Sequence, residues 1–242
     1  ILYFYNFLKI YATTYKQEML GLILFIFIAP TLILGFVPLT DSAGMFFIVL
    51  ALYQYSIKSN IFIRIVTISI GILARETVFF IVPLIIIWSF MDIPNIFKKH
   101  GFKKFKNWDV SWKRLFKELT LLPVIPFTVL IILKMWAPED FLTIPTITNI
   151  NININNLMTE RTLTTIGQLL IIGIIGIYGN FKWILYRDKQ VWKLLFGIII
   201  FSIPLFYTFL YENISFRFFW IFFVFAIPLM INSIDKLGEM YL

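Results

Sequence analysis

The stretch IFIRIVTISIGILARETVFFIVPLIIIWSF, residues Ile61–Phe90, decides the fold class and runs for about 30 residues. A helix needs about 20 apolar residues to cross about 30 Å of hydrocarbon, so this stretch is too long for one ordinary span. Arg75 and Glu76 interrupt it, and a charge at the middle of a bilayer costs several kcal/mol. We therefore predict two short helices, 61–74 and 77–91, whose connecting turn lies below the membrane surface in a wet or protein-lined pocket.

The composition of the whole chain agrees with a membrane protein. Of its 242 residues, 60% are hydrophobic and 14% are charged, against about 45–50% and about 25% in soluble domains. These fractions argue against a soluble globular enzyme, and the high hydrophobicity excludes a disordered chain. Because there is no cysteine and only one histidine, His100, a disulfide framework and a thiolate or histidine metal cluster are excluded as well. The predicted fold is all-α, a polytopic integral membrane helix bundle.

Hydropathy predicts about eight membrane helices in all. The predicted spans are 19–38, 41–56, 61–74, 77–91, 119–136, 163–178, 191–210 and 215–233. The first ten residues, ILYFYNFLKI, resemble the end of a further membrane helix, so we expect the chain to be the C-terminal portion of a longer protein. The predicted organisation is an N-terminal group of membrane helices (1–91), a basic segment (92–117), and a C-terminal group (118–242) that contains an outer loop (137–162).

The basic segment 92–117 sets the predicted orientation. Its apolar residues recur at helical spacing between lysines, which is typical of an amphipathic helix on an anionic membrane surface: Phe105, Trp108, Trp112 and Leu115. With this segment in the cytoplasm and every span alternating, four of the 21 Lys and Arg residues fall on the outer side: Arg75, Lys134, Arg161 and Arg217. The positive-inside rule therefore favours an integral membrane protein with cytoplasmic basic loops, and the net charge of +8 does not call for a nucleic-acid partner.

In this topology three predicted hairpin tips carry ionisable side chains to the outer face: Asp41, Arg75, Glu76, Glu212 and Arg217. Charged groups at membrane depth are candidates for a functional site. Arginines suit an anionic substrate. A carboxylate can act as a general base or can bind a divalent metal ion, which is the cofactor that these residues would suit.

Other interpretations of these residues stay open at this stage. Asp41 also fits an ordinary helix N-cap. Arg75 and Glu76 could pair with each other to solvate a turn, and Arg217 could extend to lipid phosphates.

Two further patterns carry structural predictions. Glycines at every third position, Gly173, Gly176 and Gly179, predict close packing of the helix 163–178 against a neighbour. The alternating segment Asn149–Asn156 is of low complexity, and we expect an irregular loop there.

Three stretches of the chain resemble the polytopic membrane glycosyltransferases of the GT-C type, which use polyprenyl-phosphate-linked sugars. They are IAPTLILGFVPLTDSAGMFFIVLALY (Ile28–Tyr53), GILARETVFFIVPL (Gly71–Leu84) and YENISFRFFWIFFVFAIPL (Tyr211–Leu229). The shared pattern is a proline-broken helix with an outer aspartate, a pair of short helices around a charged break, and an acidic residue followed by an arginine and a last helix with proline.

The resemblance implies transfer of a sugar from a polyprenyl-phosphate-linked donor on the outer face of the membrane, to a glycan, lipid or protein acceptor. Arg75 and Arg217, with Glu212, would hold the donor phosphate, and Asp41 and Glu76 are the candidate catalytic carboxylates. The chain departs from the family in one respect. The family's catalytic acid usually lies in the first outer loop, and this sequence resembles only the part of the family's chain beyond that loop. Asp41 and Glu76 would then be supporting residues.

Two alternatives come from other functional classes. Broken helices with buried charges also suit a transporter or flippase for an anionic lipid or glycan, although the two halves of the chain show no internal repeat. A non-catalytic membrane subunit, surrounded by membrane lipids, is the third interpretation.

Overall fold

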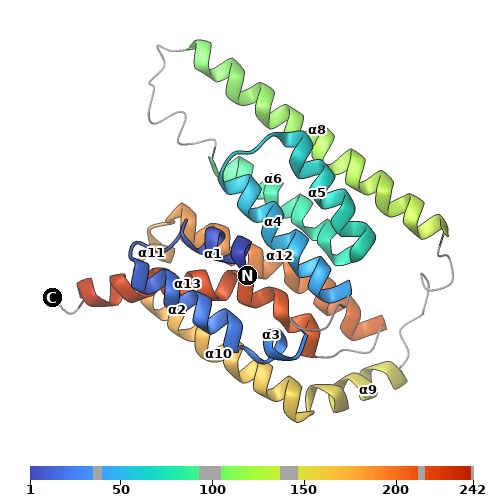
Figure 1. The fold of residues 1–242 in the computed structure, drawn as a ribbon, viewed down its shortest axis with the longest axis vertical. Helices are drawn as coiled ribbons and strands as arrows, with labels where there is room; N and C mark the ends of the chain where they lie inside the picture. The colour runs from blue at the N-terminus through green and yellow to red at the C-terminus, as the bar shows by residue number, and fades with distance from the viewer. Residues whose placement is uncertain (35–39, 93–104, 137–146, 212–215, 241–242) are drawn as a thin grey trace.

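The structure is a computed structural model that describes residues 1–34, 40–92, 105–136, 147–211 and 216–240, and within these ranges every regular element is a helix. Figure 1 shows the longer helices side by side, with α8 at one edge of the bundle and α10 at the other. The helices are α1 (Leu2–Leu8), α2 (Tyr15–Phe27), α3 (Ala29–Leu34), α4 (Thr40–Ser56), α5 (Ile61–Ala74), η1 (Glu76–Phe80), α6 (Ile81–Asp92), α8 (Phe105–Trp136), α9 (Ile147–Leu157), α10 (Glu160–Gly179), α11 (Phe181–Leu185), α12 (Lys189–Tyr211), η3 (Phe216–Phe219) and α13 (Trp220–Met240).

Three helices in the described part of the chain are long and apolar enough to cross a membrane: Phe116–Leu133 within α8, Glu160–Gly179 and Lys189–Phe206 within α12. Two shorter apolar helices, Ile61–Ala74 and Trp220–Ile234, accompany them. Helix length and composition thus support a helical membrane protein, while the predicted count of about eight spans is not confirmed.

The predicted break in the central apolar stretch is confirmed. α5 ends at Ala74, and Arg75 has an extended backbone (φ −158°, ψ 123°) before the chain enters the 3-10 turn η1. The amide of Val78 closes that turn by donating to the Arg75 carbonyl at 3.1 Å. The second short helix therefore starts as a tight 3-10 turn and becomes α-helical only from Ile81.

The predicted helix 19–38 is wrong at its start and in its continuity. Helix α2 begins at Tyr15, because Thr14 and Gln17 form a capping box that satisfies its first amides. It ends at Phe27, where Ile28 is extended (φ −67°, ψ 143°) and Pro30 opens the short helix α3. The side chain of Gln168 in α10 accepts from the Ala29 amide at 2.9 Å, so the break stays hydrogen-bonded.

Two other predicted segments differ in the structure. Residues 105–117 of the basic segment and the predicted helix 119–136 join into the single helix α8, which contains Pro123 and Pro126, while residues 93–104 lie outside the described residues. The irregular loop predicted over Asn149–Asn156 is wrong, because these residues belong to helix α9. The buried Asn153 side chain fastens α9 to α12 by donating to the Phe209 carbonyl at 2.7 Å.

Because successive helices run in alternating directions, their ends form two groups, which we call the Asp41 end and the Asp92 end. The Asp41 end holds Asp41, Arg75 and Trp220, and the Asp92 end holds Tyr55, Ser89, Asp92, Glu118 and Lys193. Apolar side chains fill the core between them, among them Leu52, Ile68, Leu84 and Phe225.

Two turns at the Asp92 end have unusual backbone geometry. Lys58 (φ 56°) and Arg187 (φ 55°) are the non-glycine residues with positive φ in the described chain. Each lies two residues beyond the last residue of a helix, where glycine is the usual residue. The left-handed conformation costs a residue with a Cβ about 1–2 kcal/mol.

Candidate functional site

An ion pair between two predicted site residues forms the centre of the candidate site. Asp41, in the first turn of α4, pairs through its carboxylate with the guanidinium of Arg75, at the break between α5 and η1. The side chains retain 10% and 22% of their exposure, so water or a ligand still reaches the pair. Arg75 thus finds its partner on a separate hairpin, which places the two charges in one site.

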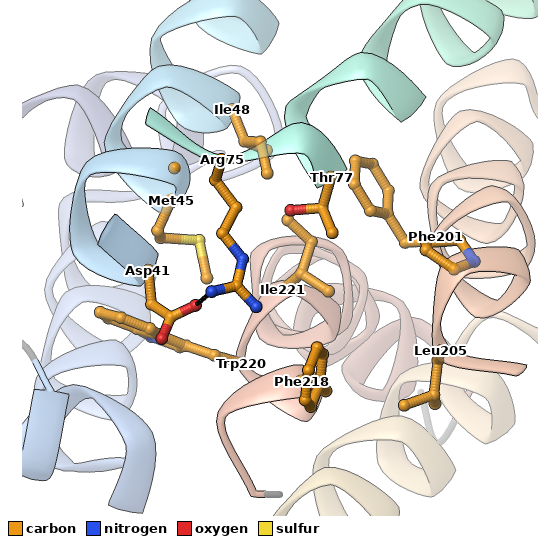
Figure 2. Close-up of a pocket in the computed structure, with 12 residues that line it drawn as sticks. Asp41, Met45, Ile48, Arg75, Thr77, Phe201, Leu205, Phe218, Trp220 and Ile221 are labelled. Carbon is orange, nitrogen blue, oxygen red and sulfur yellow. Dashed lines mark ion pairs between the residues drawn. The ribbon is translucent and has the colours of Figure 1, made fainter. Parts of the chain in front are cut away.

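The ion pair lines a pocket at the Asp41 end with an empty volume of about 520 Å³, counting the space at its open mouth. Figure 2 shows Asp41 and Arg75 pointing toward each other on one side, with Phe201 and Leu205 of α12 facing them across the pocket. Phe218 and Trp220 supply aromatic surface next to the charges. The pocket therefore combines one cation and one anion with apolar walls, as small-molecule sites usually do.

The position of Arg75 depends on two close neighbours. The Phe218 ring centroid lies 5.5 Å from its guanidinium carbon, within the range of a cation–π contact. Gly44 lies against its side chain on the other side, because a Cβ on Gly44 would come within 2.8 Å of the Arg75 Cβ. A larger residue at position 44 would push Arg75 away from this place.

A second, more apolar pocket adjoins the first and shares Met45 and Trp220 with it. Its empty volume is about 720 Å³, and aromatic side chains such as Phe4, Phe25 and Phe46 line it. The indole nitrogen of Trp220 donates to the Thr31 hydroxyl at 2.9 Å, which fixes the ring between the two pockets. A charged compartment and an apolar compartment therefore lie next to each other.

The other predicted site residues are placed less fully. Glu76 begins η1 and is exposed. Glu212 lies outside the described residues, and Arg217 is described only by its backbone in η3. No group of three or more His, Cys, Asp or Glu side chains that could hold a metal ion occurs within the described ranges. At the ion pair, Asp41 supplies the carboxylate that a metal ion could contact, and this carboxylate already pairs with Arg75.

The sequence interpretation missed a second charged cluster, at the Asp92 end. Arg64 of α5 donates to Glu118 of α8 at 2.8 Å, and the two side chains are 1% and 3% exposed. Ser89 donates to the other oxygen of Glu118 at 2.5 Å. The sequence holds a signal for this cluster, because Arg64 places a charge within the apolar run IFIRIVTIS.

The same cluster continues to the surface of the Asp92 end. Tyr55 donates to Asp92 at 2.9 Å, and Lys193 forms an ion pair with the same carboxylate. The nearby Tyr11, in the turn after α1, is buried, and this burial together with the charge of Asp92 raises the pKa of its hydroxyl. Burial therefore reinforces the neutral form that a tyrosine already has at physiological pH.

The distance along α5 between Arg64 and Arg75 limits how the two charge clusters can lie in a membrane. From Arg64 to Arg75 the helix axis rises roughly 16 Å at 1.5 Å per residue. Since the hydrocarbon layer is about 30 Å thick, two groups this close along one helix cannot lie on opposite sides of it. A membrane that separates the Asp41 end from the Asp92 end would therefore hold at least one of the two charge clusters at hydrocarbon depth, where ionisable groups are costly unless paired.

No protein-family model, curated protein or solved structure matches this chain. Its function therefore has to be argued from the site, which consists of a pocket lined by the Asp41–Arg75 pair and an adjoining apolar pocket.

Proposed function

We propose that this chain acts as a GT-C-like membrane glycosyltransferase that transfers a sugar from a polyprenyl-phosphate-linked donor on the outer face of the membrane. The observation that carries the proposal is the convergence of Asp41 and Arg75, from separate hairpins, in one pocket beside an apolar one. A polyprenyl phosphate sugar has the matching parts, namely an anionic phosphate, a polar sugar and an apolar chain. A guanidinium also matches the geometry of phosphate oxygens.

In the proposed mechanism, the donor phosphate competes with Asp41 for the Arg75 guanidinium. Charge-assisted contacts to Arg75 stabilise the phosphate as the bond between the sugar anomeric carbon and the phosphate oxygen breaks and the electron pair leaves with the phosphate. The acceptor hydroxyl oxygen forms the new bond to that carbon. Asp41, released from Arg75, is placed to accept the hydroxyl proton or to support another carboxylate that does so.

Substitutions at the ion pair test this mechanism. Arg75→Gln is expected to raise the KM for the donor roughly 10- to 100-fold, the range for losing hydrogen bonds to a charged group. Asp41→Asn is expected to lower kcat about 10²-fold or more if it is the base. Transfer of a radiolabelled sugar from polyprenyl phosphate by the full-length protein in membranes measures both. Arg161→Gln, an exposed arginine at the start of α10, is the matched control.

Unchanged sugar transfer in both variants would remove these residues from the site. The buried charges at the opposite end of the same helices favour a second candidate, a transporter or flippase for an anionic lipid or glycan. That function would lead if no sugar transfer is detectable while movement of a fluorescent anionic lipid depends on Arg75. If neither activity occurs, the chain is a non-catalytic subunit.

Transfer on the outer face also requires the Asp41 end to face outward, and single cysteines test this because the chain has none of its own. Thr159→Cys, before α10 at the Asp41 end, should react with a membrane-impermeant maleimide added to intact cells. Gln190→Cys, in the first turn of α12 at the other end, should react only after permeabilisation. Both side chains are exposed. The reverse pattern would invert the orientation.

A further inference from the structure

Two cationic residues with a left-handed backbone, Lys58 and Arg187, lie in turns at the Asp92 end. Both turns are complete Schellman motifs. Lys58 and Ser59 donate their amides to Tyr55 and Gln54, at 3.0 and 2.9 Å. At the end of α11, Arg187 and Asp188 donate in the same way to Ile184 and Trp183, at 3.1 and 2.9 Å.

The residue with positive φ in this motif is usually glycine, yet both turns place a long cation there. A cation near a helix C-terminus interacts favourably with the helix dipole, but this gain is smaller than the cost of the left-handed backbone. Strained residues of this kind persist mainly where function requires the side chain.

The acidic side chains described at this end are already engaged within the protein. Asp92 pairs with Lys193, Glu118 pairs with Arg64, Glu18 accepts from the Tyr5 hydroxyl, and Asp188 accepts from the first amides of α12. The cations that remain exposed around this end are Lys9, Lys16, Lys58, Lys117, Lys182 and Arg187. Among the described side chains of this end, the exposed cations therefore outnumber the acids, and the acids are only partly exposed or buried.

Most of these cations have an exposed apolar or aromatic neighbour in the chain. The neighbours are Tyr15, Ile57, Phe116, Phe181 and Tyr186, each 54% exposed or more. An apolar side chain that inserts among acyl chains beside a cation that meets a phosphate is the pattern of an interfacial lipid contact.

We propose that the Asp92 end binds the headgroups of anionic phospholipids, with Lys58 and Arg187 as its principal contacts. Each side chain is held at the end of a helix by its Schellman turn, with Ile57 and Tyr186 beside it for the acyl region. This inference is independent of the proposed sugar transfer, since it concerns the opposite end of the bundle.

The experiment separates lipid binding from fold stability. Lys58→Gly with Arg187→Gly should relieve strain, so the purified full chain in neutral detergent should melt higher, by roughly 2–4 °C per position. The same double variant should lose roughly 30-fold of its preference for phosphatidylglycerol over phosphatidylcholine in mixed vesicles, because each cation near an anionic surface contributes about a fivefold factor. Mass spectrometry of the lipids that copurify measures this preference.

The charge-retaining pair Lys58→Arg with Arg187→Lys should keep the lipid preference, and raised salt should weaken it. Arg161→Gln, at the opposite end, should change neither reading. An unchanged phosphatidylglycerol preference in the glycine double variant would overturn the proposal. So would a fall in its melting temperature, because the cations would then serve the helix ends alone.

Discussion

Glu118→Ala is expected to lower the free energy of unfolding by about 3–5 kcal/mol, the typical cost of removing one partner of a buried ion pair. Arg64 would remain 1% exposed with its charge uncompensated. Its Nε and Nη1 atoms already lack hydrogen-bond partners among the described residues, so the lost Nη2 contact has no nearby replacement. Ser89 would also lose the acceptor of its shortest hydrogen bond.

Reversible unfolding in mixed detergent micelles, followed by circular dichroism, measures this loss. The double variant Arg64→Leu with Glu118→Leu should recover most of the stability, because a buried pair and an apolar pair of similar volume often differ little. Glu160→Ala, an exposed acid at the start of α10, is the matched control and should have little effect. A double variant as unstable as Glu118→Ala would mean that the network, rather than the unpaired charge, determines stability.

Gly176→Ile should destabilise the protein by about 1–3 kcal/mol or more, because it forces α10 away from α13. A Cβ at Gly176 would lie 3.0 Å from the backbone nitrogen of Met230 and 3.3 Å from the Leu229 carbonyl carbon. Backbone atoms within a packed helix cannot move aside as a flexible side chain does. Asn180 spans the same contact by donating to the carbonyls of Gly176 and Leu229, each at 2.8 Å, and separation of the helices would break the second bond.

Gly173→Ile provides the comparison within the same helix. A Cβ at Gly173 meets nothing within 4 Å, so this change should leave stability unchanged or slightly improved, since glycine is a poor helix former. Unfolding midpoints of the two variants, measured side by side in one detergent, give the answer. Equal effects at positions 173 and 176 would contradict the close approach of α10 and α13.

The pair of glycines also shows what a sequence pattern can predict. Glycines at every third position predicted close packing of this helix, and the structure confirms it for Gly176 but not for Gly173. A period of three is shorter than the 3.6 residues of a helical turn, so the positions drift around the helix. Gly176 and Gly179 are buried, whereas Gly173 has turned away from the closest contact. Only the placement of α13 decides which glycine is needed.

The candidate site was likewise predicted only in part from the sequence. Asp41 and Arg75 were both predicted to lie on one face, because charges in apolar stretches stand out and alternating spans bring their tips together. That they pair with each other, rather than Arg75 with Glu76, depends on the extended backbone of Arg75 and on the space left by Gly44. The two pockets, and the place of Trp220 between them, could not be predicted because they form between helices distant in sequence.

By itself the sequence determined that the described part of the chain is helical and of membrane character, that α5 ends just before Arg75, and that ionisable groups gather at the helix tips. These properties follow from hydropathy and from the cost of a charge in hydrocarbon, which act locally along the chain. The tertiary structure alone decided the partners: Asp41 for Arg75, Glu118 for Arg64 and Lys193 for Asp92. A buried charge needs some counter-charge, but which one it meets is set by the packing of helices that join distant residues, and no local pattern records that choice.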